Sequence, residues 1–505
     1  MKRFIAAVMM GVFAVSWLWL AATSADAKTL RVGMTGLPPA KGNPYYTTAT
    51  TAYMFFNVMF DALTQIDETG TVRPWLALEW KPLNETTWHF KLRPNVTFSN
   101  GEPFDAAAVK TTFDFLLSDA AVAQSVPRDI AFVAGVSVVD PLTVEIVTKT
   151  PNILLPRYLS GINIVAPKQL TNLGLDGFAQ APVGTGPFKV DSWGADKVLM
   201  SAFRGSWRPP IVDNIEMLSL PDATARVNAL ETKRIDVAPN INPDDAVRLK
   251  TLGIRFHHRN PTRVLVVALD VLRDGSPFKD VRVRQALNYA VNRQAIIDSL
   301  LGGLEKPASQ AATPATVGYV RELEPYPYDP DKARQLLAEA GYKDGFSFMM
   351  EVPGGQLAND KAIGQQIAAD LSRVGVQVEV REITFPQLVR NMTQGNWKGL
   401  ALQTDFSSAP ALDVIRALYR HSCVWPGKWY CDQEIQPTLT EAERTFDVDR
   451  RTKLTQQVVK RYRDMASSLY LFPVVSLDGL SPRVTRWEPW NDNFMYHLAD
   501  VKDGE

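Results

Sequence analysis

Residues 329–383 read DPDKARQLLAEAGYKDGFSFMMEVPGGQLANDKAIGQQIAADLSRVGVQVEVREI, and this stretch decides the fold class. Its first part predicts a helix that Asp329 caps, that Pro330 begins and that Gly341 follows. A second helix over 361–374 ends before Gly375, and residues 376–383 alternate as a strand does. Helix and strand joined through short glycine connections are typical of an α/β lobe.

The same mixture of helix and strand extends toward the N-terminus. Strands are predicted at 29–34, 87–92, 142–147 and 264–269, with a loop at 36–39 and a turn at Asn100-Gly101. Helices are predicted at 49–63, from Asp105 to Leu116, at 223–232 and at 281–300. The chain is therefore expected to be α/β throughout.

The N-terminus has the layout of a secretory signal peptide. Lys2 and Arg3 precede an apolar run over 4–20, and Ala25-Asp26-Ala27 follows. The run is nearly long enough to span a bilayer, so an uncleaved anchor is the alternative. Cleavage after Ala27 would make Lys28 the first mature residue, and no cysteine stands there to accept a lipid. We therefore expect a free periplasmic protein, if the host has two membranes.

The size and charge of the mature chain, residues 28–505, restrict its class. It carries 52 basic and 53 acidic side chains, a formal net charge of −1, which gives no reason to expect binding to nucleic acid or to an anionic membrane. Chains longer than about 250 to 300 residues usually divide into domains, so two or three lobes are expected. With 46% apolar and 21% charged residues, the chain can bury large cores.

The only two cysteines, Cys423 and Cys431, lie close together around Pro426-Gly427, which supplies a turn. Because the predicted compartment is oxidising, we expect them to form a disulfide. A pair of buried free thiols is the alternative. A metal site is disfavoured because His421 is the only histidine nearby.

Catalytic motifs with recognisable spacing are absent from the sequence. It contains no zinc-binding His-Glu-x-x-His, no Gly-x-Ser-x-Gly elbow and no phosphate-binding glycine loop. The cluster Gly184-Thr185-Gly186-Pro187 is interpreted as a turn. His257 and His258 are neighbours on a predicted strand and so face opposite ways, which disfavours a shared metal. We expect neither an enzyme nor a cofactor.

Several segments together resemble the extracellular solute-binding proteins of family 5, the oligopeptide-, dipeptide- and nickel-binding receptors of ABC importers. They are VRPWLA at 72–77 with Trp80, FKLRPNVTFSNGEPF at 90–104, VGTGPF at 183–188, PFKDVRVRQALNYA at 277–290 and the helix at 329–341. The resemblance implies a two-lobed periplasmic binding protein-like α/β clamp (type II, cluster C) with an extra subdomain in the first lobe. It also implies ligand capture by hinge closure and delivery to an ABC permease and ATPase complex.

The resemblance also suggests how the chain divides. Residues 28–65, 187–264 and 478–505 would form the core of lobe I, residues 66–186 the extra subdomain, and residues 265–477 lobe II. We expect a monomer that binds a small-molecule ligand and no nucleic acid.

Candidate ligand-binding residues follow from the same resemblance. In the peptide receptors, an aspartate after a tryptophan-containing strand holds the amino terminus of the ligand, and Asp405 stands where that aspartate belongs. Leu402 replaces the tryptophan, and residues 407–410 replace the usual acid-proline turn. A carboxylate in a closing cleft needs a cation or several donors, so Asp405 predicts a cationic or hydroxyl-rich ligand group. An exposed loop aspartate, or one that caps a helix starting near Ala411, is the alternative.

The other predicted cleft residues are Gly36 and Leu37 after the first strand, Asn240 after the strand at 235–237, and Trp397 and Phe406 as apolar or stacking walls. A short peptide, an opine or an oligosaccharide are all open as ligands. A sensory binding protein and, less favoured, an exported hydrolase are the competing functions.

Overall fold

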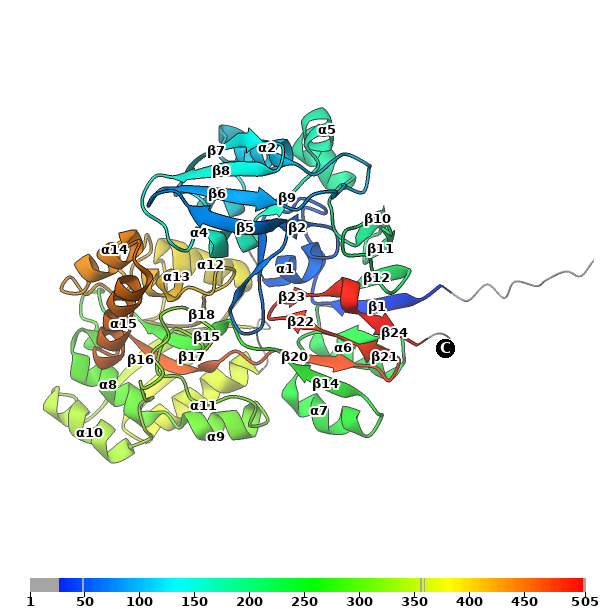
Figure 1. Ribbon diagram of the computed structural model, residues 1–505. Coiled ribbons are helices and arrows are strands. Elements are labelled where there is room, and N and C mark those ends of the chain that lie inside the picture. Colours follow the sequence, from blue (N-terminus) through cyan, green and yellow to red (C-terminus); the bar gives the residue numbers. More distant parts are fainter. Residues whose placement is uncertain (1–26, 48–49, 355–356, 358, 503–505) are drawn as a thin grey trace, which may run out of the picture.

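The computed structural model describes residues 27–47, 50–354, 357 and 359–502 (Figure 1). The predicted signal peptide, residues 1–27, lies outside the described residues except for Ala27. Figure 1 shows a subdomain at the top, one lobe at the right around β1 and β20, and a second lobe at the lower left. Among the described residues, no helix combines the length and apolar character that a membrane span requires.

Lobe I is built on a seven-stranded sheet in the order β10-β11-β12-β1-β13-β20-β14. Its strands are β1 (Thr29–Met34), β10 (Phe188–Trp193), β11 (Lys197–Ala202), β12 (Asn214–Ser219), β13 (Val237–Ala238), β14 (Arg255–His258) and β20 (Leu477–Leu480). β1 lies parallel to β12 and β13 at the centre. The helices α6 (Ala223–Glu231) and α7 (Pro243–Lys250) share a core with this sheet.

The subdomain contains a four-stranded antiparallel sheet in the order β5-β6-β8-β7, packed against α2 (Ala106–Leu116). Its strands are β5 (Ala77–Pro82), β6 (Thr87–Leu92), β7 (Val133–Asp140) and β8 (Thr143–Thr148). Its core is continuous with that of lobe I, because one hydrophobic cluster includes Phe90 and Phe113 as well as Leu30. The subdomain and lobe I therefore share one core.

Lobe II contains a five-stranded sheet in the order β17-β16-β18-β15-β19. Its strands are β15 (Arg263–Leu269), β16 (Phe346–Pro353), β17 (Val376–Ile383), β18 (Ala401–Ser407) and β19 (Ser468–Pro473). Side chains alternate between two cores: Leu265 faces α8 (Val281–Ala290), α9 (Arg293–Leu300), α10 (Pro330–Glu339) and α11 (Asp360–Ser372). Val264 faces α12 (Phe385–Gln394), α13 (Val414–Tyr419), α14 (Gln436–Arg444) and α15 (Val448–Asp464).

Two connecting segments join the lobes. Residues 259–262 run from β14 to β15, and residues 474–476 run from β19 to β20. The predicted border between residues 264 and 265 falls inside β15, and the exact lobe borders stay a prediction.

Most predicted elements are confirmed, and two helices need correction. α10 and α11 form, with Asp329 as the cap of α10 and with Gly341 and Gly375 at positive φ after the two ends. The helix predicted at 281–300 breaks between α8 and α9, because Val291 is extended and the Asn292 side chain accepts from Ala295 N to start a new helix.

The helix predicted at 49–63 is also shorter than expected. It ends as α1 (Thr50–Phe56), because the carbonyls of Val58 and Met59 accept hydrogen bonds from Phe188 and Gly186. The predicted disulfide between Cys423 and Cys431 is confirmed.

Candidate functional site

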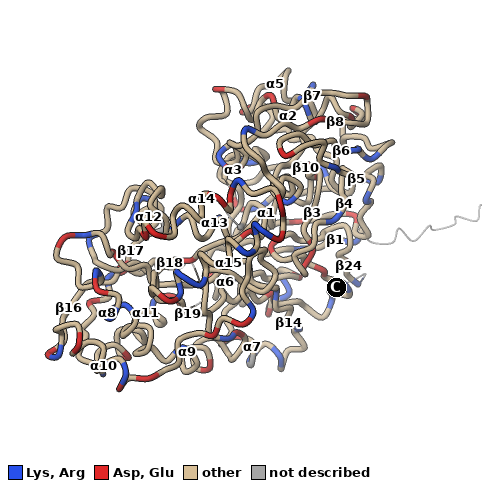
Figure 2. The backbone as a smooth tube through the Cα atoms, turned by 60° about the vertical axis from the view of Figure 1, so that its left-hand side comes forward, with Lys and Arg blue, Asp and Glu red and all other residues tan. Residues whose placement is uncertain are grey.

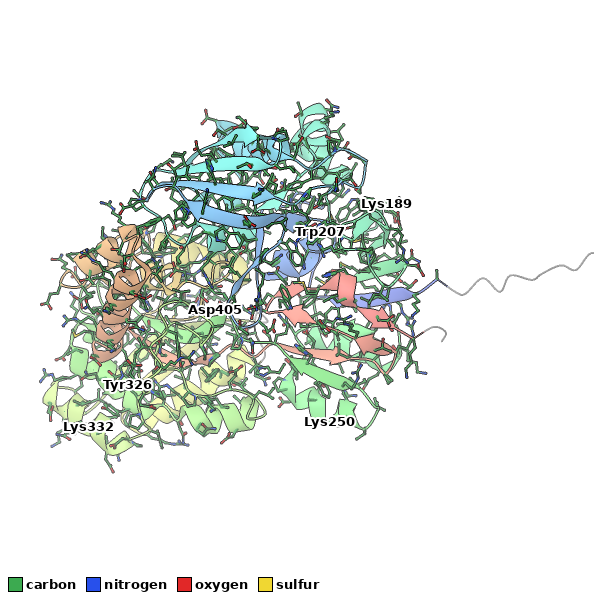
Figure 3. The ribbon with its side chains drawn as sticks, viewed as in Figure 1. Lys189, Trp207, Lys250, Tyr326, Lys332 and Asp405 are labelled. Atoms are coloured by element: carbon green, nitrogen blue, oxygen red, sulfur yellow. A yellow bond between two sulfur atoms is a disulfide. The ribbon has the colours of Figure 1, made fainter. Side chains whose placement is uncertain are left out.

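The candidate site lies where the strand ends of the two lobes approach each other. In Figure 1, β1 runs toward the middle of the molecule, and β18 lies in lobe II, where its end pairs with the start of β15. Figure 3 labels Asp405, near the end of β18, in the middle of the molecule between the lobes. Lysine, arginine and acidic residues are interspersed over both lobes in Figure 2.

Asp405 is half-buried, and its carboxylate has spare hydrogen-bonding capacity. Arg263 Nη1 lies 3.7 Å from its Oδ2, and 26% of the Asp405 side chain is exposed. Arg420 Nη1 donates to the main-chain oxygen of Asp405 at 3.0 Å and not to the carboxylate. Among the described residues, no hydrogen bond reaches the carboxylate oxygens. The site can thus accept an additional donor group at this position.

Asp405 does not cap the helix that follows it. α13 begins at Val414, and the side chain of Asp413 accepts from Ile415 N at its start. The expected helix start near Ala411 is therefore wrong by a few residues, and the capping alternative for Asp405 is excluded. Asp405 lies in β18, where its side chain is on the same face as that of Leu265, its cross-strand partner.

Phe406 lies on the other face of β18 and is fully buried. Its ring stacks on Trp429 with centroids 6.3 Å apart, and the guanidinium of Arg420 lies 5.8 Å from its centroid. Arg420 lies equally close to the ring of Trp425. The Phe406 ring therefore makes a cation–π contact with Arg420.

Trp397 lies in the same core. Its indole nitrogen donates to Asn391 O at 2.8 Å, and its ring packs on Trp429 with centroids 5.3 Å apart. Only 6% of the residue is exposed. The structure therefore places Trp397 in the packing behind β18, with little surface left for a ligand.

Asn240 belongs to a polar cluster beside the connecting segments. Its side-chain oxygen accepts from Arg259, a fully buried arginine that also binds Asp478 and Asp492. Because Asp478 and Asp492 lie beside it, the pKa of Arg259 is raised in spite of its burial. Thr262 donates to Asp492 at 2.9 Å. Asn240 thus contacts Arg259 in the connecting segment 259–262.

Gly36 and Leu37 follow β1 directly. A Cβ built on Gly36 would meet no atom within 4 Å, so open space lies beside it. Leu37 is half-buried and packs against the core shared by lobe I and the subdomain. Of the six predicted residues, the structure brings Asp405, Phe406 and Trp397 into one lobe, and the other three lie on lobe I.

Residues 409–416 contact the subdomain across the cleft. Arg416 on α13 forms an ion pair of 3.2 Å with Asp129 on α3 (Val126–Asp129). The Tyr158 hydroxyl on α4 (Leu155–Tyr158) donates to Asp413 at 3.0 Å, and Arg157 donates to Ala411 O at 2.7 Å. The cleft is therefore closed at this point.

Tyr53 lies among these charges. Burial and the nearby Asp129 raise the pKa of its hydroxyl, and Arg416 opposes the shift. Sequence reasoning missed Tyr53, Arg416 and Arg420. The four-residue spacing of the two arginines was the one available signal, since it places both on one side of a helix shortly after Asp405.

In the part of the chain that the structure describes, no group of three or more histidine, cysteine or acidic side chains is arranged to hold a metal ion. Burial lowers the pKa of His421 and His497 to about 3, so both rings are neutral at ordinary pH.

Comparison with known proteins finds consistent similarity. The family described as "Bacterial extracellular solute-binding proteins, family 5 Middle" matches residues 71–422. Glutathione-binding protein GsiB of Escherichia coli (strain K12) is 28% identical over 437 residues, which cover 82% of each chain.

Two solved structures share the fold. NikA from Brucella suis, in complex with Fe(III)-EDTA, has a TM-score of 0.82 at 24% identity and covers 94% of this chain and 100% of its own. The periplasmic binding protein DppA from Helicobacter pylori, in complex with the peptide STSA, has a TM-score of 0.78 at 21% identity and covers 94% and 98%. The two-lobed clamp architecture is thus shared over nearly the whole chain.

Proposed function

Because the chain belongs to the bacterial extracellular solute-binding proteins of family 5, we propose that it is the receptor of an ABC importer and captures a peptide-like solute between its lobes. The family match supports the role of solute-binding receptor. The state of Asp405 supports the peptide-like solute.

The ammonium group of a peptide suits Asp405. A half-buried carboxylate that lacks hydrogen-bond donors gains most from a charged donor, since charge-assisted bonds are about twice as strong as neutral ones. Arg263 stands 3.7 Å away, beyond hydrogen-bonding distance, so it does not use the hydrogen-bonding capacity of the carboxylate. This observation carries the assignment of the ligand class.

The carboxylate of a zwitterionic solute also has partners available. Arg263 lies 3.7 Å from the Asp405 carboxylate, and Arg420 donates to the main-chain oxygen of Asp405. Guanidinium groups bind carboxylates in a bidentate way, so a solute with one ammonium and one or two carboxylates would match the charges of this cleft. Glutathione, which the Escherichia coli relative is named for, is such a tripeptide.

Capture then proceeds by rotation about the connecting segments. In the closed form, Arg416 and Asp129 meet across the cleft, and a solute enclosed beneath them would add contacts to both lobes. A solute that binds the closed form better shifts the population toward it, and that form is the one delivered to the permease. The receptor would act as a monomer, exported with cleavage after Ala27.

The test is a thermal-shift titration of residues 28–505, unfolded and refolded to remove any bound solute. The panel contains glutathione, dialanine, the peptide STSA, the opine octopine and the oligosaccharide maltotriose. A ligand at 100 times its dissociation constant adds about 2.7 kcal/mol of stability. We expect at least one peptide to stabilise the protein and to remain chemically unchanged.

Two comparisons locate the binding group. Asp405→Asn should lower the affinity for the peptide at least tenfold. Asp274→Asn, at a fully exposed carboxylate, should leave that affinity unchanged. N-acetylation of the peptide removes the ammonium charge. It should lower the affinity of the unmodified protein about as much as Asp405→Asn does, and it should lower the affinity of the Asp405→Asn variant little. Stabilisation by octopine or maltotriose alone would reject the peptide assignment, and consumption of the ligand would reject the receptor.

A further inference from the structure

A cavity that Asp405 does not line lies beside the connecting segments. It has a volume of about 550 Å³, within the size range of small-molecule sites. Its floor includes His258, the last residue of β14, and Pro473, the last residue of β19. We name it the rear pocket and define it by these two residues with residues 68–69, 260–261, 304–310, 312–315, Tyr319 and Arg321.

Asp405 does not line the rear pocket, and the two lie on different strands of the lobe II sheet. β19 is the outermost strand of its sheet, and β15 lies between it and β18. Ala308, in the wall of the pocket, donates its N–H to Leu471 O of β19. The pocket therefore lies at the edge of the sheet, two strands away from β18, which carries Asp405.

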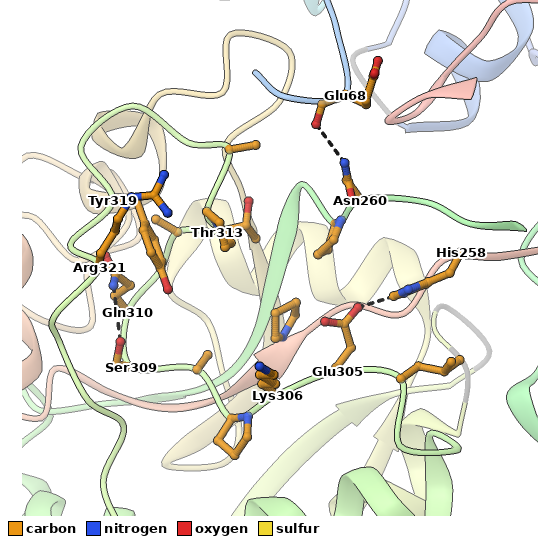
Figure 4. A pocket seen from close by; sticks show the side chains of 18 of the residues that line it. Glu68, His258, Asn260, Glu305, Lys306, Ser309, Gln310, Thr313, Tyr319 and Arg321 are labelled. Atoms are coloured by element: carbon orange, nitrogen blue, oxygen red, sulfur yellow. Dashed lines mark hydrogen bonds and ion pairs between the residues drawn. The ribbon is translucent and has the colours of Figure 1, made fainter. Parts of the chain in front are cut away.

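Both lobes contribute to the walls of the rear pocket. Glu68 and Thr69 fall within residues 66–186, the predicted subdomain of lobe I. Asn260 Nδ2 donates to Glu68 O at 2.8 Å. The segment 304–315 falls within residues 265–477, the predicted lobe II, and Ala308 donates to Leu471 O of β19. Figure 4 shows the Glu68 side chain directed away from the interior, so its carboxylate does not oppose the charges that line the pocket.

Two basic residues, Lys306 and Arg321, line the rear pocket, and both are exposed. Glu305 is paired with His258 at 3.0 Å, and only 8% of its side chain is exposed. Lys306 and Arg321 form no hydrogen bond or ion pair with any described residue. Both lie around the same cavity in Figure 4.

The rest of the lining is largely apolar and rigid. Four prolines line the pocket, at positions 261, 307, 314 and 473, together with three alanines and Leu304. Tyr319 is half-buried, and Figure 4 shows its ring as one wall with the hydroxyl turned inward. Rigid walls of this kind lose little conformational freedom when a ligand binds.

We propose that the rear pocket is a second small-molecule site, which takes an organic acid with an apolar body. The anionic group lies toward Lys306 and Arg321, and the apolar body lies against Tyr319 and the prolines. The proposal does not depend on which solute occupies the cleft around Asp405.

The probe for the test is 1-naphthaleneacetate, with the neutral 1-naphthaleneacetamide as its partner of the same shape. Binding to residues 28–505 is followed by calorimetry and by the NMR signals of alanine methyl groups. We expect the methyl signals of the lining residues Ala308, Ala312 and Ala315 to shift on addition of the acid, and that of Ala333 in α10 to stay unchanged.

Two double variants test whether Lys306 and Arg321 bind the anionic group of the probe. The double replacement Lys306→Met with Arg321→Gln should lower the affinity for the acid at least tenfold and leave the affinity for the amide unchanged. The matched control is the double replacement Lys332→Met with Arg334→Gln on α10. It should change neither the affinity for the acid nor that for the amide. Equal binding of acid and amide, undiminished binding to the double variant, or unchanged lining methyl signals at millimolar probe would each overturn the proposal.

Discussion

Arg416 of α13 and Asp129 of α3 form an ion pair across the cleft, with nitrogen and oxygen 3.2 Å apart. About a quarter of each side chain is exposed, so water screens the pair only in part. The pair exists only when lobe II meets the subdomain. It therefore contributes to the closed form and not to the folding of either part.

Replacement of Arg416 by glutamine should shift the population toward the open form. We expect the affinity for the captured solute to fall about fivefold, which corresponds to about 1 kcal/mol, and the midpoint of thermal unfolding without solute to change little. Asp129→Asn should give the same loss, and the two together no further loss. Arg334→Gln removes an ion pair within one helix and serves as the control. Additive losses would show that the pair is not formed.

Replacement of Asp413 by alanine should destabilise the protein strongly. Its fully buried carboxylate accepts from the Tyr158 hydroxyl, from Ile415 N and from Arg451 at 2.7 Å. Its loss leaves Arg451 buried without a counter-ion, so we expect the free energy of unfolding to fall by about 3–5 kcal/mol. The measurement is chemical denaturation.

Asp447→Ala is the matched control for Asp413→Ala. Asp447 is exposed and caps α15 through a single bond to Arg450 N, so its loss should cost about 1 kcal/mol. Equal costs for the two replacements would mean that the buried network contributes nothing beyond a cap.

The disulfide between Cys423 and Cys431 should stabilise the fold. Opening a loop of about nine residues lowers the free energy of unfolding by about 2.5 kcal/mol in the chain-entropy account. We expect a reductant to lower the melting temperature of the unmodified protein but not that of the double serine variant. A reductant effect that persists in the serine variant would contradict this assignment.

Acid should weaken the fold through its buried histidines. The pKa of His421 is lowered to about 3 by burial and by the nearby Arg420, whereas an unfolded histidine titrates near 6.5. Below pH 6.5 the unfolded chain takes up a proton that the folded chain does not, so stability is present above that pH and is lost as the pH falls toward 3. The loss is up to about 1.4 kcal/mol per pH unit for each such histidine.

Urea unfolding above and below pH 6.5 measures this effect, and His421→Gln should have a shallower acid dependence than the unmodified protein. The NMR signals of the His421 ring should also stay those of a neutral imidazole across this range. A ring that titrates near 6.5 in the folded protein would contradict the prediction.

The elements that could be predicted carry local signals. Asp329 caps α10 through its own side chain, and Gly341 and Gly375 adopt a positive φ that other residues reach only with strain. The break at Asn292 was missed, because an asparagine inside an apolar periodicity does not reveal whether it will start a new helix. The early end of α1 depends on carbonyls that bind residues 186–188, far along the chain.

The candidate site was predictable only where a motif marked it. Asp405 was predicted from the resemblance to the peptide receptors, and the structure adds that it lies within β18 beside Arg263 and Arg420. Asp129 and Tyr53 carry no motif. Their proximity to Arg416 results from packing between parts that are distant in sequence.

The sequence by itself determined the α/β class, the capped helices, the cysteine pair and the family to which the chain belongs, because these depend on backbone preferences and motifs within a few residues. The tertiary structure alone decided that Phe406 and Trp397 are buried behind β18, that Arg416 meets Asp129 and that Lys306 and Arg321 line one cavity. These relations join segments from different parts of the chain. Their distances are set by how the cores of both lobes pack, and no local preference encodes them.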